Sequence, residues 1–398
     1  MVVVTVAVVL YKSLGISNTD IAFYTSWLYL PWVIKPLWSP AVDLVRTKRS
    51  WVLAMQGVIG GALAAAALAL SAPFFLPASL AVFWLLALSS ATHDIAADGF
   101  YLLALPPHQQ AAFVGVRNTF YRVAMIAGQG GLVYLAGSLQ ERFGNAPRAW
   151  AVAFAAAAVL FTAAAGYHFF VLPRPAGDRR AASTGPSLQN FLAVFASFFR
   201  KKDIGIILAF LLVYRLGEAQ LLKLVPPFLL DRRAAGGLGL TTRDVGLLYG
   251  TIGVAALIVG GLAGGYAIAR FGLKRLLWPM LICMHLPIAA FVALALAQPE
   301  SLAIIGAALT VEQFGYGFGF TAYMVYMMMI ADGEHRTSHY AICTGFMALG
   351  LMLPGFPAGW IEDQVGYPRF FIWVCLSTIP SFVAAALIRI DPGYGRKL

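Results

Sequence analysis

Long apolar runs separated by short polar stretches cover most of the chain. A helix needs about 20 apolar residues to cross the hydrocarbon core of a bilayer. The runs fall at about residues 1–11, 21–40, 51–72, 80–105, 113–138, 150–172, 204–230, 244–269, 275–297, 302–331, 339–360 and 369–389. This pattern predicts an all-α membrane protein with twelve spanning helices, arranged as six, a pause and six.

The first apolar run, residues 1–11, is shorter than the others. At 1.5 Å per residue it reaches only about half of the roughly 30 Å hydrocarbon core, so we expect the first helix to be truncated in this sequence. A secretory signal peptide is the competing interpretation. The segment Met1–Val4 has no basic residue and no cleavage motif follows it, so we favour the shortened helix.

The pause covers residues 173–203 and divides the chain into predicted halves at 1–172 and 204–398. It is rich in Arg and Lys, which favours a cytoplasmic linker and places both termini in the cytoplasm. Apolar residues recur in it at helical spacing, at Leu188, Phe191, Leu192, Phe195, Phe198 and Phe199. We interpret them as an amphipathic helix on the inner membrane surface, with a helix-packing face as the alternative.

Composition excludes a soluble enzyme. Hydrophobic residues make up 60% of the chain and charged residues 11%, against roughly 25% charged residues in a soluble globular domain. The net charge of +11 is explained by basic cytoplasmic loops, so we do not infer nucleic-acid binding. The three cysteines lie in apolar runs without metal-ligand spacing, and we interpret them as packing residues.

Two motifs occur twice, each at the same place in its half of the chain. Residues 14–22 (LGISNTDIA) return as 238–246 (LGLTTRDVG), and residues 136–144 (AGSLQERFG) return as 358–366 (AGWIEDQVG). Because six spans is an even number, both halves point the same way across the membrane. The chain is therefore predicted to be a parallel tandem repeat.

This organisation resembles the major facilitator superfamily, whose signature loops follow spans two and eight. Residues 39–48 resemble the first loop and keep its acidic residue, Asp43, but lack its glycines. Residues 265–274 resemble the second loop and keep Gly265, Arg270 and Gly272, but have Ala269 in the acidic position. The resemblance implies that Asp43 and these second-loop residues form conformational gating contacts, with unequal contributions from the two halves.

A closer resemblance lies in residues 32–43 (WVIKPLWSPAVD) and 93–100 (HDIAADGF). These segments are similar to the AmpG-type muropeptide permeases and the related acetyl-CoA transporters. Membership of that branch implies proton-driven import of a cell-wall fragment across the bacterial inner membrane. It also implies alternating access, with spans one, four, seven and ten lining a central cavity.

Charged residues inside the predicted spans are the candidate functional residues. A charge at the bilayer centre costs about 2.5 to 3.5 kcal/mol on insertion scales, so these side chains should face protein or water and find partners. They are Asp94, Asp98, Glu218, Glu312, Lys35, Arg117, Arg122, Arg215 and Lys223. Helical depth predicts that Asp94 meets Arg122 and that Asp98 meets Arg117. Lys35 and Lys223 lie near span ends, where snorkelling accounts for both.

Proton coupling requires a carboxylate that is neutral in one state and ionised in another. Glu312 and Asp94 are the candidates, and they are expected to converge in the cavity with Arg215 and Glu218. Arg215 can hold Glu218 ionised or bind an anionic group of the substrate. The alternatives are permanent ion pairs between spans four and five, and a neutral Glu312 hydrogen-bonded between helices.

Span ten contains the glycine-rich aromatic segment 314–323 (FGYGFGFTAY). Its glycines predict a helix break at a binding site, where Tyr316 and Tyr323 offer rings and hydroxyls to a sugar. Close helix packing through small residues is the alternative. We interpret His93, His168 and His285 as core histidines.

The sequence thus predicts a proton-coupled symporter of a muropeptide-like solute, acting as a monomer by alternating access. Its predicted partners are a small-molecule substrate, protons and the lipid bilayer. No metal, nucleotide or covalent cofactor is implied, because neither a phosphate-binding loop nor a His/Cys cluster is present. A proton-coupled exporter of drugs or metabolites is the first alternative, and a polytopic membrane enzyme is the second.

Overall fold

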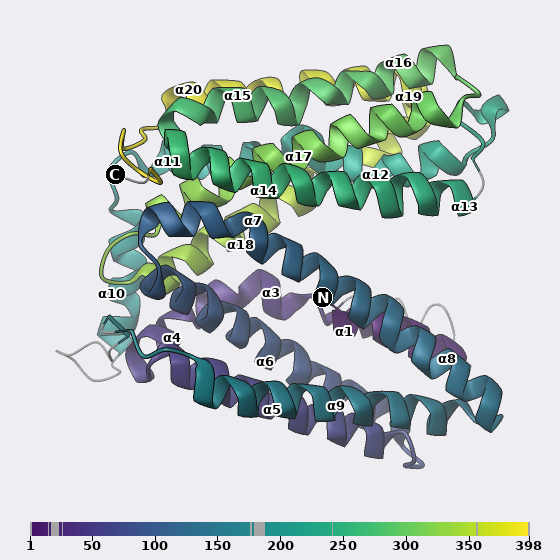
Figure 1. The fold of residues 1–398 in the computed structure, drawn as a ribbon, viewed down its shortest axis with the longest axis vertical. Helices are drawn as coiled ribbons and strands as arrows, with labels where there is room; N and C mark the ends of the chain where they lie inside the picture. Colours follow the sequence, from purple (N-terminus) through teal and green to yellow (C-terminus); the bar gives the residue numbers. More distant parts are fainter. Residues whose placement is uncertain are drawn as a thin grey trace. The chain divides into compact units, whose positions relative to one another are not determined.

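The computed structural model describes residues 2–14, 16, 24–25, 27–175, 177–178, 188–240, 242–355 and 357–396, and Figure 1 shows its ribbon. Throughout these residues the regular structure is helical, which confirms the predicted all-α class. The helices of the first half and the linker are α1 (Val2–Ser13), α3 (Leu30–Ile34), η1 (Lys35–Leu37), α4 (Ser39–Val45), α5 (Lys48–Ala69), α6 (Phe75–Ala104), α7 (Pro107–Met125), η2 (Ile126–Gly131), α8 (Leu132–Phe143), α9 (Ala146–Val171) and α10 (Leu188–Phe199).

The second half repeats this succession of long and interrupted helices. Its elements are α11 (Ile204–Val213), α12 (Leu216–Leu230), η3 (Arg233–Ala235), α13 (Thr242–Val245), η4 (Gly246–Gly253), α14 (Val254–Phe271), α15 (Leu273–His285), η5 (Leu286–Ile288), α16 (Ala289–Ala297), α17 (Leu302–Ile330), α18 (Arg336–Gly355), α19 (Ala358–Leu376) and α20 (Ile379–Leu387).

Seven helical stretches in the described part of the chain are long and apolar enough to cross a membrane. They are 48–69, 75–104, 146–171, 204–230, 247–271, 273–297 and 358–387. Other predicted spans are helical but interrupted: a 3-10 turn separates α3 from α4, and the π-helical turn η2 separates α7 from α8. Most described residues of the predicted spans are thus helical, with short turns between some of the helices.

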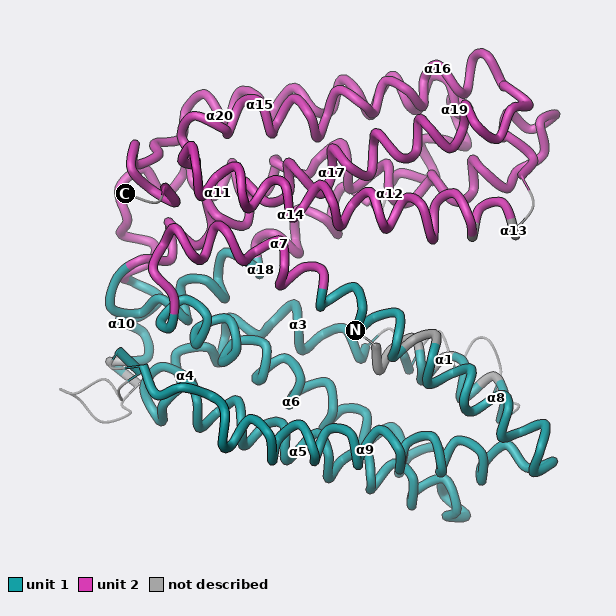
Figure 2. Tube along the Cα trace, in the orientation of Figure 1, with its two compact units in different colours: residues 1–104, 120–196, 333–345 teal, residues 105–119, 197–332, 346–398 magenta. Residues whose placement is uncertain are grey.

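The chain forms two compact units, drawn in different colours in Figure 2. The first unit holds residues 1–104, 120–196 and 333–345, and the second holds 105–119, 197–332 and 346–398. Each unit therefore takes most of one predicted half and one short segment of the other. The exchanged segments are the start of α7 and the start of α18.

Aromatic side chains fill the core of each unit. In the first unit, Phe83 contacts Tyr11 and Phe154, with ring centroids 5.9 Å apart in both pairs. In the second unit, Phe228 lies 4.9 Å from Phe371 and 5.0 Å from Tyr367. Burying such rings gives each unit a large hydrophobic contribution of its own.

Both copies of the second repeated motif end at a glycine with positive φ. Gly144 follows α8 with φ of 63°, and Gly366 interrupts α19 with φ of 74°. A residue with positive φ interrupts a helix at little cost only when it is glycine. This shared ending explains why the glycine recurs at 144 and 366. Most of the motif copy at 14–22 lies outside the described residues.

The linker contains the predicted helix, α10. Leu192 and Phe199 are exposed, whereas Val194 and Phe198 are fully buried, and the Phe199 ring contacts Phe346. The helix therefore has a packing face as well as an exposed apolar face, so both interpretations given above have support. Residues 179–187 of the linker lie outside the described residues.

Candidate functional site

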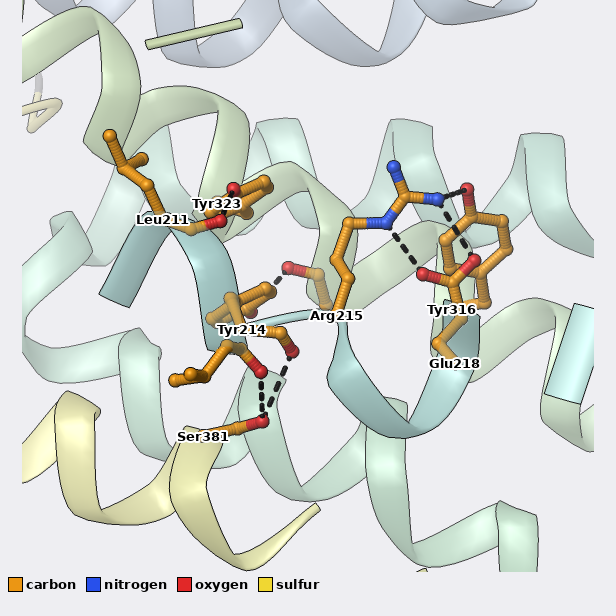
Figure 3. A network of polar contacts seen from close by, with 9 residues as sticks. Leu211, Tyr214, Arg215, Glu218, Tyr316, Tyr323 and Ser381 are labelled. Atoms are coloured by element: carbon orange, nitrogen blue, oxygen red, sulfur yellow. Dashed lines mark hydrogen bonds and ion pairs between the residues drawn. The ribbon is translucent and has the colours of Figure 1, made fainter. Parts of the chain in front are cut away.

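Predicted span seven is broken in the second unit. Helix α11 ends at Val213 and α12 begins at Leu216, and Arg215 between them has φ of −105° and ψ of 16°. A break leaves backbone carbonyls without helical partners, which is costly in a buried position. Here other helices supply donors, because the Tyr323 hydroxyl donates to the Leu211 carbonyl and Ser381 Oγ donates to the Val213 carbonyl at 2.7 Å (Figure 3).

The break predicted for span ten is absent, and this prediction was wrong. Helix α17 runs uninterrupted over 29 residues. Its glycines instead permit close packing, because a Cβ at Gly315 or Gly317 would overlap a carbonyl of a neighbouring helix. The alternative given above, small-residue packing, is the one observed. The interruption lies instead in span seven. Tyr323, the last residue of the glycine-rich segment, packs against it.

Arg215 and Glu218 form an ion pair just after this break. Arg215 Nε and Nη2 donate to the two carboxylate oxygens of Glu218, at 2.6 Å and 2.9 Å. Nη2 also donates to the Tyr316 hydroxyl of α17 at 3.0 Å, and the guanidinium lies 4.8 Å from the Phe320 ring centroid (Figure 3). The structure thus brings together three predicted site residues, Arg215, Glu218 and Tyr316.

Tyr323 contacts residues on the break in span seven through both its ring and its hydroxyl. Its ring stacks on the Tyr214 ring with centroids 4.6 Å apart and an interplanar angle of 2°. The Tyr214 hydroxyl donates to the Gly319 carbonyl of α17 at 2.8 Å, while the Tyr323 hydroxyl reaches back to Leu211. The two tyrosines therefore tie the broken span to α17 in both directions. Tyr323 is fully buried, so its visible role here is structural.

Glu312 lies on α17 one turn before Tyr316 and is only 2% exposed. Its carboxylate accepts a hydrogen bond from Gln313 Nε2 at 2.8 Å. Among the residues that the structure describes, no Lys or Arg side chain pairs with Glu312. Leaving a buried carboxylate ionised without a cation is expensive, so this position favours the neutral acid.

In the first unit, the partner of Asp94 differs from the prediction. Lys35 Nζ donates to Asp94 Oδ2 at 2.5 Å, and the predicted partner Arg122 is not part of this ion pair. The interpretation of Lys35 as a snorkelling residue was also wrong, because its side chain is only 7% exposed. Lys35 opens the 3-10 turn η1 and is followed by Pro36, so the helix of this predicted span is irregular at the residue that pairs with Asp94.

Two predicted contacts join residues of different units. Asp98 is a buried residue of the first unit, whereas Arg117 belongs to the second. Asp94 likewise lies in the first unit, while Arg215, Glu218 and Glu312 lie in the second. The Asp98–Arg117 pair and the convergence of the four midplane charges remain predictions.

Asp43 joins the exchanged start of α18 to the first unit. Its Oδ1 accepts from Lys48 Nζ at 2.7 Å, and its Oδ2 accepts from the Ser338 amide at 3.0 Å and from the Ser338 hydroxyl. A carboxylate at a helix start satisfies free amides and complements the helix dipole. Asp43 therefore holds the first turn of α18, a contact suited to the predicted gating role.

The second signature loop makes a different contact. Gly265 on α14 lies against the exchanged start of α7, where a Cβ would come within 2.7 Å of the Ala111 carbonyl oxygen. After Gly272, the Leu273 amide donates to the Tyr394 carbonyl of the C-terminal segment at 3.1 Å. The segment 391–396 thus covers the loop that lacks an acidic residue. Arg270 is exposed, with its guanidinium 5.5 Å from the Phe271 ring centroid.

Comparison with known proteins decides the family. The model of the Major Facilitator Superfamily matches residues 1–353. The chain belongs to the major facilitator superfamily. It is therefore a multi-pass membrane transporter of a small-molecule solute and not an enzyme.

Relatives of this transporter support the more specific resemblance. It is 26% identical over 376 residues to the anhydromuropeptide permease of Escherichia coli strain K12, covering 92% of this chain and 72% of that protein. Its fold matches a variant of the Escherichia coli fucose:proton symporter FucP with a TM-score of 0.73, 14% identity and coverage of 98% and 96%. It also matches the proton:xylose symporter XylE bound to 6-bromo-6-deoxy-D-glucose, with a TM-score of 0.66, 13% identity and coverage of 100% and 96%. The resemblance to AmpG-type permeases is thus confirmed.

Sequence reasoning missed three contributors to these sites in the transporter. Ser381 donates to a carbonyl at the break in span seven, Ser338 donates to Asp43, and Lys35 pairs with Asp94. The serines carry no signal in a single sequence, because their role depends on helices far away in the chain. Lys35 did carry one, since Pro36 follows it directly and a proline inside a span indicates a local break.

Proposed function

We propose that this transporter is a proton-coupled symporter of a muropeptide-like solute, a sugar carrying a peptide. It acts as a monomer in the bacterial inner membrane, with both termini in the cytoplasm. The halves 1–172 and 204–398 alternate access to the solute, and Glu312 carries the coupled proton. Arg215 and Tyr316 supply the polar contacts that the solute meets in the second half.

The observation that carries the proposal is the contrast between Glu312 and Glu218. Glu218 has a bidentate cation partner in Arg215, whereas Glu312 has only the amide of Gln313 among the described residues. A proton carrier must be stable in its neutral form inside the protein, and burial without a cation favours that form. Release of the proton from Glu312 then requires a second state, in which the Glu312 carboxylate meets water or the Arg215 guanidinium.

The substrate class draws support from the relative with a named substrate. The printed name of the Escherichia coli protein is anhydromuropeptide permease, and the similarity extends over 92% of this chain. Such a solute offers hydroxyls, amides and carboxylates, all of which an Arg and a Tyr hydroxyl can bind. The chemistry of the Arg215–Tyr316 contact is therefore compatible with that solute.

Uptake into proteoliposomes tests the proposal. The wild type should accumulate a labelled anhydro-muropeptide when the outside is more acidic than the lumen, and Glu312→Gln should lose this gradient-driven accumulation. Glu300→Gln is the matched control, because Glu300 is exposed and lies between α16 and α17. Accumulation that is independent of the gradient, or unchanged in Glu312→Gln, would refute the proton role. Extrusion driven by the same gradient would instead favour the exporter.

A further inference from the structure

The two signature loops lie against the two exchanged helix starts, but with different chemistry. In the first loop, Asp43 accepts a hydrogen bond from the Ser338 amide at the start of α18. In the second loop, Gly265 lies against Ala111 at the start of α7. The position that matches Asp43 in the repeat holds Ala269, whose side chain cannot accept a hydrogen bond. The second loop therefore has no carboxylate at the position from which Asp43 holds its helix start.

The C-terminal segment, residues 391–396, reaches this second helix start through Gly395. Gly395 is buried, and a Cβ added to it would lie 2.9 Å from Ile268 Cγ2, 3.6 Å from Ala111 Cβ and 3.8 Å from Val325 Cγ1. These three neighbours belong to α14, α7 and α17. Gly395 thus fills the junction of three helices, and one of them, α7, comes from the other predicted half of the chain.

Backbone hydrogen bonds give the C-terminal segment a defined shape. The Tyr394 amide donates to the Asp391 carbonyl at 3.1 Å, which closes a turn, and the Leu273 amide of the second loop donates to the Tyr394 carbonyl at 3.1 Å. Gly395 follows with φ of 81°, a conformation that favours glycine. The segment is therefore attached to the second loop by its backbone, and its next residue enters the helix junction.

Helix α7 connects this junction to the first unit. Its residues up to 119 belong to the second unit and those from 120 belong to the first, as the change of colour along α7 shows (Figure 2). A Cβ at Gly115 would overlap the Gly261 carbonyl, so the backbones of α7 and α14 are in direct contact. The start of α7 and the end of α14 both lie at the predicted cytoplasmic side. Opening toward that side requires these two helix ends to separate.

We propose that the C-terminal segment restrains opening toward the cytoplasm, with Gly395 holding the start of α7 against α14 where the second loop lacks a carboxylate. While the segment is seated, Ala111 stays buried and the two halves stay joined at this end. The contact between Gly395 and Ala111 breaks each time the halves separate there, so its strength sets how often they do. The inference rests on the alternating access of the proposed function and adds a regulatory role for residues 391–396.

A reversible disulfide tests whether this contact breaks during transport. In a background lacking Cys283, Cys343 and Cys375, the pair Ala111→Cys and Gly395→Cys places two Cβ atoms 3.6 Å apart, within the roughly 3.5 to 4.5 Å of natural disulfides. Oxidation should stop uptake, and reduction of the same sample should restore it. Ala111→Cys alone, oxidised and reduced, is the control. Uptake at an unchanged rate in a sample that thiol titration shows to be bridged would overturn the inference.

Thiol labelling measures the restraint without any solute. Ala111 is fully buried, so Ala111→Cys in the same background should react slowly with a maleimide in detergent. Gly395→Ala should raise this rate by roughly fivefold or more, because leaving the junction relieves the left-handed backbone of a residue other than glycine. Gly393→Ala is the matched control and should leave the rate unchanged, since its added Cβ lies 3.7 Å from its nearest neighbour, the Asp391 carboxylate. Equal rates in the two variants would overturn the inference.

A second buried position separates opening of the junction from general loosening of the fold. Ala153 is fully buried on α9 in the first unit, so Ala153→Cys reports on a core far along the chain from the C-terminal segment. Its labelling rate should be the same with and without Gly395→Ala. Equal acceleration at Ala153→Cys and Ala111→Cys would show unfolding instead of opening and would refute the restraint.

Labelling and uptake together separate this inference from the proposed function. If the wild type takes up no anhydro-muropeptide but Gly395→Ala still accelerates labelling of Ala111→Cys alone, the proposed substrate falls and the restraint stands. If uptake is normal while Gly395→Ala leaves the labelling rate unchanged, the restraint alone falls.

Discussion

Arg215 holds both carboxylate oxygens of Glu218, at 2.6 Å and 2.9 Å, immediately after the break in span seven. The pair is almost entirely buried, with Arg215 6% exposed and Glu218 2% exposed. Its charges therefore neutralise each other inside the second unit. Arg215 also contacts Tyr316, which lies one turn after Glu312 on α17, so one helix carries both Glu312 and a hydrogen-bond partner of the pair.

Breaking this ion pair should be more damaging than removing it. Glu218→Gln leaves the Arg215 charge buried without its partner, and we expect a loss of about 3 to 5 kcal/mol in unfolding free energy. The double variant Arg215→Met with Glu218→Leu should recover most of that stability but should not transport. Thermal melting in detergent and uptake in proteoliposomes measure the two effects. Equal stability of Glu218→Gln and the wild type would contradict the buried pairing.

The broken backbone of span seven should depend on its hydroxyl donors. Tyr323→Phe keeps the stacking on Tyr214 but removes the donor to the Leu211 carbonyl, and Ser381→Ala removes the donor to Val213. We expect each variant to lose about 1 to 3 kcal/mol of unfolding free energy, since each leaves a buried carbonyl unsatisfied. Tyr134→Phe serves as the control because Tyr134 is 79% exposed. If all three variants melt at the same temperature, the hydroxyl donors of Tyr323 and Ser381 do not stabilise the break.

Sequence reasoning located the helices better than their breaks. Apolar runs of span length constrain a helix strongly, and in the described residues the predicted spans form helices with short interruptions, such as the turn at Tyr214 and Arg215. The glycines of 314–323 looked like a break because glycine weakens an isolated helix. In the folded chain they serve close helix contacts, and the break appears instead at Tyr214 and Arg215. The packing that decides between these outcomes involves residues far apart in sequence.

Positions counted along regular helices similarly predicted one ion pair, Arg215 with Glu218, but not the partner of Asp94. Proximity on one helix was enough to predict Arg215 with Glu218, which are three residues apart. For Asp94, the same reasoning favoured Arg122, because a regular helix keeps Lys35 near the span end. Lys35 instead opens a 3-10 turn and pairs with Asp94, and a depth count that assumes a regular helix does not include such a turn.

Asp43 should protect the start of α18 from hydrogen exchange. Asp43→Ala removes the acceptor of the Ser338 amide, so amides of the first turn of α18 should exchange faster. Asp178→Ala is a matched control, because Asp178 accepts from the Lys48 and Arg49 amides of α5 at 2.6 Å and 2.9 Å. It should accelerate exchange at α5 and leave Ser338 unchanged. Unaltered exchange at Ser338 in Asp43→Ala would refute the capping role.

The C-terminal segment should be sensitive to substitution of one glycine. Gly395 has φ of 81°, and a Cβ there would lie 2.9 Å from Ile268 Cγ2 of α14. Gly395→Ala is therefore expected to lose at least about 1 to 2 kcal/mol from the left-handed backbone. Gly393→Ala should be tolerated, because its nearest neighbour to an added Cβ is the Asp391 carboxylate at 3.7 Å. Thermal melting compares the two, and equal melting temperatures would show that the segment does not stabilise the loop.

Simultaneous recording of proton and solute movement tests the central claim most directly. In proteoliposomes loaded with a pH-sensitive dye, adding an anhydro-muropeptide outside should acidify the lumen as the solute enters. Glu312→Gln should still exchange labelled for unlabelled solute across the membrane, but without any pH change, because its side chain cannot release a proton. Solute-dependent acidification by Glu312→Gln equal to that of the wild type would contradict the assignment of the proton to Glu312.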